Sequence, residues 1–198
     1  MTPGPDVRPA TDPLTFLARQ DEAPERCELV DGVVRMLPDE RATENLIKGN
    51  LVLSLRQKTR AADWRVHAGR MHLHVVAANA VLCPDLFVIE RPADLRADDD
   101  ARLLAVRLVV EVLSPSTAAY DRGRKFELYQ QLPSLQEYLL VESDRAHVDL
   151  FRRNADGLWV LHPAGPGAAV ELASVGLSIT MDEVYEDVDF SLARDATA

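Results

Sequence analysis

Residues 103–113 constrain the fold of this chain more than any other segment. They end in the apolar run Leu108-Val-Val-Glu-Val-Leu113, and the turn-forming residues Ser114-Pro-Ser follow directly. A run of this kind, without alternation between polar and apolar residues, is typical of a central strand buried on both faces. We therefore expect this segment to lie inside a sheet that is covered on both sides.

Two helices are expected to cover that sheet. Ile47, Leu51 and Leu55 recur every four residues, which predicts an amphipathic helix over residues 43–60. A second helix is expected from about residue 121 to residue 132. On it, Lys125 shares a face with Leu128, and that face points towards the sheet.

Several strands are expected around these helices. The pair Asp31-Gly32 between two apolar arms predicts a hairpin over residues 27–36. Branched and aromatic residues predict further strands at 64–68, 71–76, 85–90, 137–142, 146–151, 158–162 and 168–172. This order of elements predicts an α/β (α+β) fold with helices flanking a mixed, curved sheet.

A chain of 198 residues suits one globular domain, which we expect over residues 14–188. Residues 1–13 hold four prolines and residues 189–198 are short and polar, so both are expected to be loosely ordered tails. Without an apolar leader or a long uncharged segment, the protein is expected to be soluble, with no membrane contact.

Charge and cysteine content exclude several classes of protein. The chain has 22 basic and 32 acidic residues, a formal charge of −10, which is the reverse of a typical nucleic-acid binder. Any contact with nucleic acid must therefore be local and helped by a metal ion. The only cysteines, Cys27 and Cys83, provide neither a disulfide framework nor a zinc site, so we expect buried thiols and a cytoplasmic protein.

Glu111 is the most informative residue of the chain. Its carboxylate lies within an apolar run, where burial costs much free energy unless the group is paired or binds a cation. The alternative is that Glu111 lies on a half-exposed face or pairs with an arginine such as Arg107. Either way, the sequence predicts a partner for Glu111.

Two further residues extend this pattern into a candidate site. Asp85 follows Pro84 at the expected start of a strand, although a residue in that position is also a common turn or capping residue. Lys125 points inward, although a boundary lysine can reach water while its stem covers apolar surface. Two carboxylates on neighbouring strands and an inward lysine are what metal-assisted hydrolysis of phosphodiesters requires.

Five motifs in series resemble one known family, and they cover roughly residues 14–160. These motifs are Glu28-Leu-Val-Asp-Gly, Pro84-Asp-Leu-Phe-Val, Val110-Glu-Val-Leu-Ser-Pro-Ser, Asp121-Arg-Gly-Arg-Lys-Phe-Glu-Leu-Tyr and Glu137-Tyr-Leu-Leu-Val. The chain resembles the Uma2 family, also called DUF820, a group of restriction endonuclease-like proteins in the PD-(D/E)XK nuclease superfamily.

The resemblance implies a restriction endonuclease-like core and assigns roles to four residues. Asp85 and Glu111 would be ligands of Mg²⁺ or Mn²⁺, and Glu28 would be an additional acid that completes or orients the metal shell. Lys125 would be the active-site lysine, moved from the strand to the following helix, since Leu113 occupies the superfamily's usual lysine position.

One position departs from the family. Members usually carry a Glu-His pair at the start of the first long helix, where this chain has Glu44-Asn45. Asparagine does not titrate near neutral pH, so any proton-transfer or metal role of that histidine is lost here.

These observations lead to one main hypothesis and two alternatives. The main hypothesis is a Mg²⁺- or Mn²⁺-dependent endonuclease that acts on DNA through local contacts, as a possible homodimer. The first alternative is a catalytically inactive interaction protein with the nuclease fold. The second is a structural network of ion pairs around Lys125, whose replacement would then strongly destabilise the protein.

Two other features point to sites less strongly. His72 and His74 share one face of a strand, as in cupin-type metal sites, but the further ligands are missing. Arg122, Arg124 and Lys125 form a basic cluster that could meet phosphates or simply be a solvated helix start.

Overall fold

The computed structural model describes residues 7–8, 12–19, 26–60, 63–90 and 105–191. Its centre is a six-stranded mixed sheet in the order β11-β10-β9-β8-β7-β4. Within it, β8 and β9 are parallel, and the other neighbouring strands are antiparallel. The strands are β4 (Trp64–Ala68), β7 (Leu86–Glu90), β8 (Val106–Leu113), β9 (Glu137–Glu142), β10 (Val148–Arg153) and β11 (Trp159–Ala164). The predicted α/β (α+β) class is therefore confirmed.

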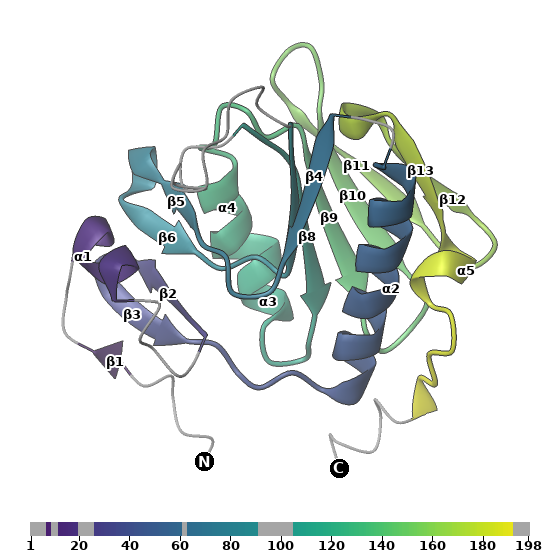
Figure 1. The fold of residues 1–198 in the computed structure, drawn as a ribbon, viewed down its shortest axis with the longest axis horizontal. Helices are drawn as coiled ribbons and strands as arrows, with labels where there is room; N and C mark the ends of the chain where they lie inside the picture. The colour runs from purple at the N-terminus through teal and green to yellow at the C-terminus, as the bar shows by residue number, and fades with distance from the viewer. Residues whose placement is uncertain (1–6, 9–11, 20–25, 61–62, 91–104, 192–198) are drawn as a thin grey trace.

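β8 is the central strand that the sequence predicts, and both of its faces are buried. Leu108 and Val110 lie in the core on the side of α2 (Ala42–Lys58), the long helix that covers this side of the sheet (Figure 1). Val109 and Leu113 lie in the core on the opposite side. Because side chains alternate along a strand, Glu111 shares the face of Val109 and Leu113. The first two residues of the expected segment, 103–104, lie outside the described residues.

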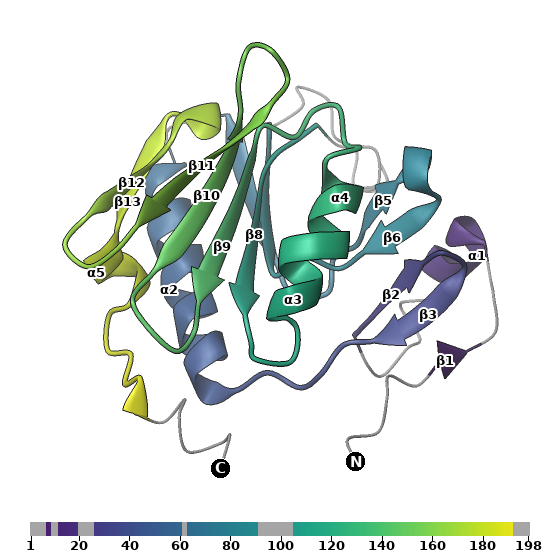
Figure 2. The same ribbon diagram turned by 180° about the vertical axis from the view of Figure 1, so that it is seen from behind.

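The second expected helix covers that opposite face (Figure 2). It is composite, with α3 (Ala118–Tyr120), a π-helical turn η4 (Asp121–Lys125) and α4 (Phe126–Tyr129) in direct succession. It therefore begins and ends earlier than the predicted range of 121–132. The π-helical turn is a rare conformation that often occurs at functional sites. Lys125 and Leu128 are both buried, so the predicted inward face is confirmed.

A second, antiparallel sheet packs beside this helix in the order β1-β3-β2-β6-β5. It contains the predicted hairpin, in which Asp31 and Gly32 both have positive φ, as a tight two-residue turn requires. Its elements, with the adjoining helices, are β1 (Val7–Arg8), α1 (Pro13–Ala18), β2 (Cys27–Val30), β3 (Val33–Met36), β5 (Leu73–Val75), η2 (Val76–Ala78) and β6 (Ala80–Leu82).

The predicted strand over 71–76 is shorter in the structure, and a separate strand, β6, follows it. A 3₁₀ turn and Asn79, with a φ of 50°, reverse the chain between them. The apolar run from Val75 to Leu82 shows no polar interruption except this asparagine, which explains why the reversal was missed.

The C-terminal part adds a small hairpin on the α2 side of the central sheet. It consists of β12 (Ala169–Leu172), η5 (Ala173–Val175), β13 (Leu177–Thr180) and α5 (Met181–Val184). Val170, Ile179 and Val184 join the core that contains α2. The sequence does not predict β13 and α5, because four-residue elements carry too little periodicity to be recognised.

The ends of the chain differ partly from the expected tails. Within residues 1–13, Val7–Arg8 pairs with β3 and Pro13 begins α1, while residues 1–6 and 9–11 lie outside the described residues. Among the helices that are described, none is both long and apolar enough to cross a membrane.

Candidate active site

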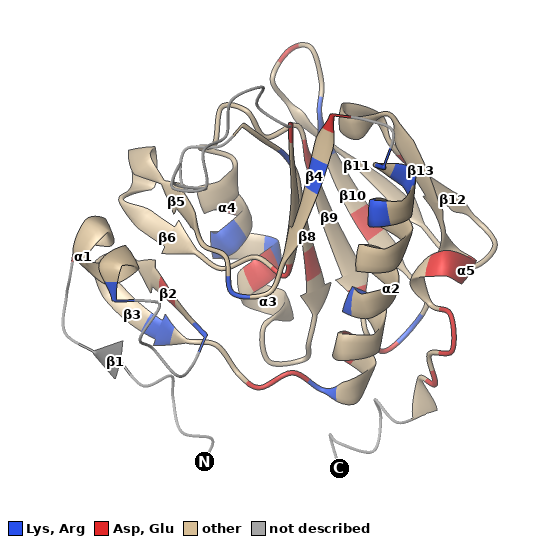
Figure 3. Cartoon of the chain, viewed as in Figure 1, with Lys and Arg blue, Asp and Glu red and all other residues tan. Residues whose placement is uncertain are grey.

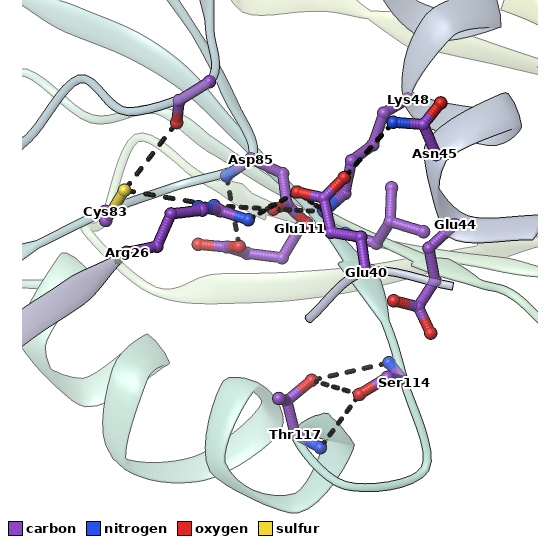
Figure 4. A network of polar contacts seen from close by, with 12 residues as sticks. Arg26, Glu40, Glu44, Asn45, Lys48, Cys83, Asp85, Glu111, Ser114 and Thr117 are labelled. Carbon is purple, nitrogen blue, oxygen red and sulfur yellow. Dashed lines mark hydrogen bonds and ion pairs between the residues drawn. The ribbon is translucent and has the colours of Figure 1, made fainter. Parts of the chain in front are cut away.

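The pairing of β7 with β8 brings Asp85 and Glu111 together. Leu86 lies opposite Val110, and Asp85, which directly precedes β7, therefore lies beside Glu111. The Asp85 amide donates a hydrogen bond to Glu111 Oε2 at 3.3 Å. Both side chains are buried, and Figure 4 shows them next to each other. Two carboxylates separated by 26 positions thus share one small volume.

Lys125 reaches these acids from the helical segment. Its Nζ lies 2.8 Å from Glu111 Oε1, 3.0 Å from Glu28 Oε1 and 3.7 Å from Asp121 Oδ1. Burial opposes the charge of this lysine, which is 3% exposed, but the surrounding carboxylates outweigh burial and hold the pKa of Lys125 well above its usual value. Lys125 is therefore a permanent cation in the site.

The positive charge of Lys125 does not fully offset the cost of burying an ionised carboxylate at Glu111. Besides Lys125, Tyr129 donates a hydrogen bond from its hydroxyl to Glu111 Oε1 at 2.9 Å. Burial raises the pKa of Glu111 to about 8, and the neighbouring charge of Asp85 adds to this effect, while Lys125 opposes it. Additional positive charge would therefore stabilise the ionised form of Glu111.

Glu28 lies in the same network, but the structure gives it a different setting from that of a metal ligand. Its Oε1 accepts the amide of Cys83 at 2.9 Å and the ammonium of Lys125, and its Oε2 accepts the hydroxyl of Tyr120 at 3.2 Å. It is fully buried and lies outside the residues that line the neighbouring pocket. Its contacts are those of a group that orients Lys125.

A small pocket of about 40 Å³, enough for one or two water molecules, opens beside Asp85, Glu111 and Lys125. Glu44, at the start of α2, also faces it and is 4% exposed. Its Oε2 accepts the amide of Arg41, whereas its buried Oε1 has no hydrogen-bond partner. Burial raises the pKa of Glu44. The sequence analysis noted the Glu44-Asn45 pair but assigned no role to Glu44.

Two basic residues that the sequence analysis missed hold Asp85. Lys48 Nζ lies 2.7 Å and Arg26 Nη2 3.1 Å from Asp85 Oδ1, and Glu40 bridges the same two cations (Figure 4). The amide of Val112 donates to Asp85 Oδ2 at 2.9 Å. Although burial opposes it, Lys48 and the other nearby cations lower the pKa of Asp85. The position of Lys48 one helical turn after Glu44 was a usable signal, since residues four apart share a helix face.

The other candidate features have structural partners. Arg122 pairs with Glu142 and Asp149, and Arg124 pairs with Asp31 and Glu127, so their charges are compensated within the chain. His72 contacts the carbonyl oxygen of Cys27. Both cysteines are buried, as predicted. Asn45 contacts Glu40.

The residues present fit a hard divalent cation in one specific way. Within the described ranges, no group of three or more histidine, cysteine, aspartate or glutamate side chains is arranged to hold a metal ion. Magnesium, however, is commonly held by one or two carboxylates, with water and substrate phosphates as its other ligands. Asp85 and Glu111 supply that pair of carboxylates, and Glu44 lines the same pocket.

Comparison with known proteins identifies the fold. The structure described as a "putative nuclease belonging to DUF820" from Anabaena variabilis superimposes with a TM-score of 0.71 and 16% identity, over 92% of this chain and 99% of that one. The chain therefore has the restriction endonuclease-like fold that the resemblance implied.

The family follows from sequence. A sequence model described as "Uma2: Putative restriction endonuclease" matches residues 13–182, and the chain belongs to the Uma2 family. Two uncharacterized proteins of Synechocystis are similar to it. One, slr1290, is 32% identical over 92% of this chain and 95% of its own length. The other, sll1609, is 26% identical over 80% and 90%, respectively.

Proposed function

We propose that this protein is a Mg²⁺- or Mn²⁺-dependent endonuclease that hydrolyses phosphodiester bonds of DNA. The observation that supports this function is the shared pocket of Asp85, just before β7, Glu111 on β8 and Lys125 in the π-helical turn η4. Membership of a family described as restriction endonucleases supports the class of reaction.

In this proposal, Asp85 and Glu111 would hold the cation, which would supply Lewis-acid activation of the phosphate and of a bound water. Lys125 keeps its proton because its pKa is raised, so it orients the attacking water as a donor and offsets developing negative charge. Glu28 and Asp121 fix the position of Lys125. Glu44 lines the pocket, and its Oε1 has no hydrogen-bond partner and lies 3.9 Å from Arg41 Nε, so Glu44 is placed to accept the proton of the attacking water.

Isosteric substitutions test these roles. We expect Asp85→Asn and Glu111→Gln to lower metal-dependent cleavage of supercoiled plasmid by about 100-fold or more, with circular dichroism spectra that match the wild type. Asp182→Asn, an exposed acid on α5, is the matched control and should cleave normally. Equal cleavage by Asp85→Asn and wild type, or cleavage that persists in EDTA, would contradict the proposed roles.

A second candidate function is a non-catalytic interaction protein that keeps the nuclease fold. It is favoured by the two cations, Lys48 and Arg26, that already neutralise Asp85, and by Asn45 in place of the family's histidine. Calorimetric titration with Mn²⁺ separates the two functions. Binding that is millimolar or weaker and unchanged in Asp85→Asn supports the interaction protein, whereas tighter binding that is lost in Asp85→Asn supports the nuclease.

A cytoplasmic location and a closed homodimer, in which two copies would cut the two strands, belong to the same proposal. Sedimentation with and without duplex DNA measures the oligomeric state.

A further inference from the structure

Three exposed arginines lie outside the candidate active site without a carboxylate partner. Arg56, Arg60 and Arg65 make no ion pair with any residue in the described ranges. This differs from Arg122 and Arg124, whose guanidinium groups are each held by two carboxylates. In a chain with a formal charge of −10, three such arginines close together form a local excess of positive charge.

These arginines gather around one groove. Arg56, on the C-terminal half of α2, Arg60, in the turn that follows α2, and Arg65, on the edge strand β4, line a groove of about 650 Å³. Trp64 and Leu53 contribute apolar surface to it. Figure 3 shows basic segments on both α2 and β4. The groove therefore combines positive charge with an aromatic side chain, a combination typical of surfaces that contact nucleic acid.

The positive potential of the groove also affects a neighbouring residue. His67 follows Arg65 by two positions, on the same face of β4. Burial lowers the pKa of His67, and the charges of Arg65 and Arg56 lower it further. The exposed acids nearest in sequence and pairing are Asp63 and Glu90, and Glu90 is already paired with Arg107 at 3.2 Å.

The groove begins next to the candidate active site along α2, since Lys48 lines the pocket and Gly49 lines the groove. Lys48 lies in the pocket and Arg56 in the groove, and eight helical residues span about 12 Å. On β4, Ala68 lies opposite Leu86, next to Asp85, whereas Arg65 lies opposite Ile89. Phosphates along one DNA strand are about 3.4 Å apart along the axis, so three or four nucleotides cover the distance.

We infer that the groove of Arg56, Arg60 and Arg65 binds the phosphate backbone of duplex DNA on one side of the scissile bond. This inference rests on the proposed nuclease function, because it assigns the groove to the substrate of that same site. The arginines contact backbone phosphates, which carry no sequence information, and position the duplex on α2 and β4. Binding at this surface needs no metal ion.

The test measures DNA binding separately from cleavage. Fluorescence anisotropy with a labelled duplex of about 20 base pairs, in EDTA and over a range of salt concentrations, gives the affinity and its salt dependence. The variant Arg56→Gln/Arg65→Gln removes one cation from each wall of the groove. The control Arg19→Gln/Arg145→Gln makes the same change in charge at exposed arginines outside it.

We expect the groove variant to weaken binding by about tenfold and to lower the slope of log K against log salt by about 2. The control should bind within about twofold of wild type, since its arginines make no phosphate contact. The inference is overturned if the groove variant keeps the affinity and slope of wild type, if the control loses as much, or if wild type does not bind the duplex. Displacement of DNA by polyglutamate of equal charge would also overturn it, because the groove would then bind any polyanion.

The result is independent of the proposed catalytic roles. If Asp85→Asn cleaves normally but the groove variant loses DNA binding, the proposed catalytic roles are wrong and the inference that the groove binds DNA is supported. If the groove variant binds DNA normally while Asp85→Asn abolishes cleavage, the inference that the groove binds DNA is wrong and the proposed catalytic roles are supported.

Discussion

Replacement of Lys125 by methionine is the most informative perturbation of this protein. Methionine keeps much of the apolar stem but removes the ammonium group, which is the common partner of Glu28, Glu111 and Asp121. Lys125 is 3% exposed, so water cannot replace the lost contacts without rearrangement. The substitution therefore leaves buried carboxylates without their compensating charge.

The magnitude follows from this burial. Removing one partner of a buried ion pair typically costs about 3–5 kcal/mol. For a chain of this size, 1 kcal/mol shifts the melting temperature by about 2–4 °C, so the expected loss is about 6–20 °C. Arg124→Met is the control, because its ion pairs with Asp31 and Glu127 are exposed and such pairs contribute about 0–1 kcal/mol.

The cost should also depend on pH, with a sign that the pKa of Glu111 determines. This pKa is raised from 4.5 to about 8 in the folded protein, so between these values the folded state keeps a proton that the unfolded state releases. Stability from this group is therefore present below about pH 4.5 and is lost as the pH rises to about 8. Lys125 lowers the pKa of Glu111 because it stabilises the ionised carboxylate. Removal of Lys125 therefore lowers the free energy of unfolding less at pH 5.5, where Glu111 is protonated, than at pH 8.5.

Urea unfolding, followed by tryptophan fluorescence at both pH values, measures this difference. We expect Lys125→Met to lose about 1 kcal/mol more at pH 8.5 than at pH 5.5, the equivalent of about one pKa unit. A loss below about 1 kcal/mol at pH 8.5, or a loss equal to that of Arg124→Met, would refute the reasoning. A large loss of stability shows that the ion pairs of Lys125 with Glu28, Glu111 and Asp121 stabilise the fold. A catalytic role of Lys125 is tested separately, by measuring DNA cleavage at a temperature where Lys125→Met is folded.

Two further predictions concern the metal ion. Mn²⁺ binding should release a proton and tighten as the pH rises towards about 8, because the cation needs the ionised form of Glu111. Calorimetry in buffers of different ionisation enthalpy measures the proton release. An affinity for Mn²⁺ that does not depend on pH would contradict this prediction. Lys48→Met should bind Mn²⁺ about tenfold more tightly than wild type, because Lys48 Nζ lies 2.7 Å from Asp85 Oδ1 and competes for that oxygen. Unchanged or weaker binding in the same titration would show that Lys48 and the ion do not compete.

The sequence predicted most of the elements because their signals are local. The turn at Asp31-Gly32 and the four-residue spacing of Ile47 and Leu51 need only neighbouring residues to form. The spacing of Glu44 and Lys48 indicates that they share a helix face, but the contact between Lys48 and Asp85 depends on how α2 lies relative to the start of β7. The register that places Leu86 opposite Val110 is also a long-range property. The strand pattern placed Asp85 and Glu111 on neighbouring strands, and the resemblance to a family added that they would share one metal ion.

Glu137 shows why burial of a carboxylate predicts a partner but not a function. Like Glu111, it is a buried carboxylate in a strand with an apolar run beside it. In the structure, Glu137 accepts hydrogen bonds from Arg152 Nε at 2.7 Å and from the amides of Ala173 and Ser174, which tie η5 to β9. These donors hold the Glu137 carboxylate outside the pocket. Glu111 lines the pocket, and its pKa stays raised although Lys125 lowers it. What separates the two acids is therefore the set of donors around each carboxylate and the pocket beside Glu111, and both are properties of the tertiary structure.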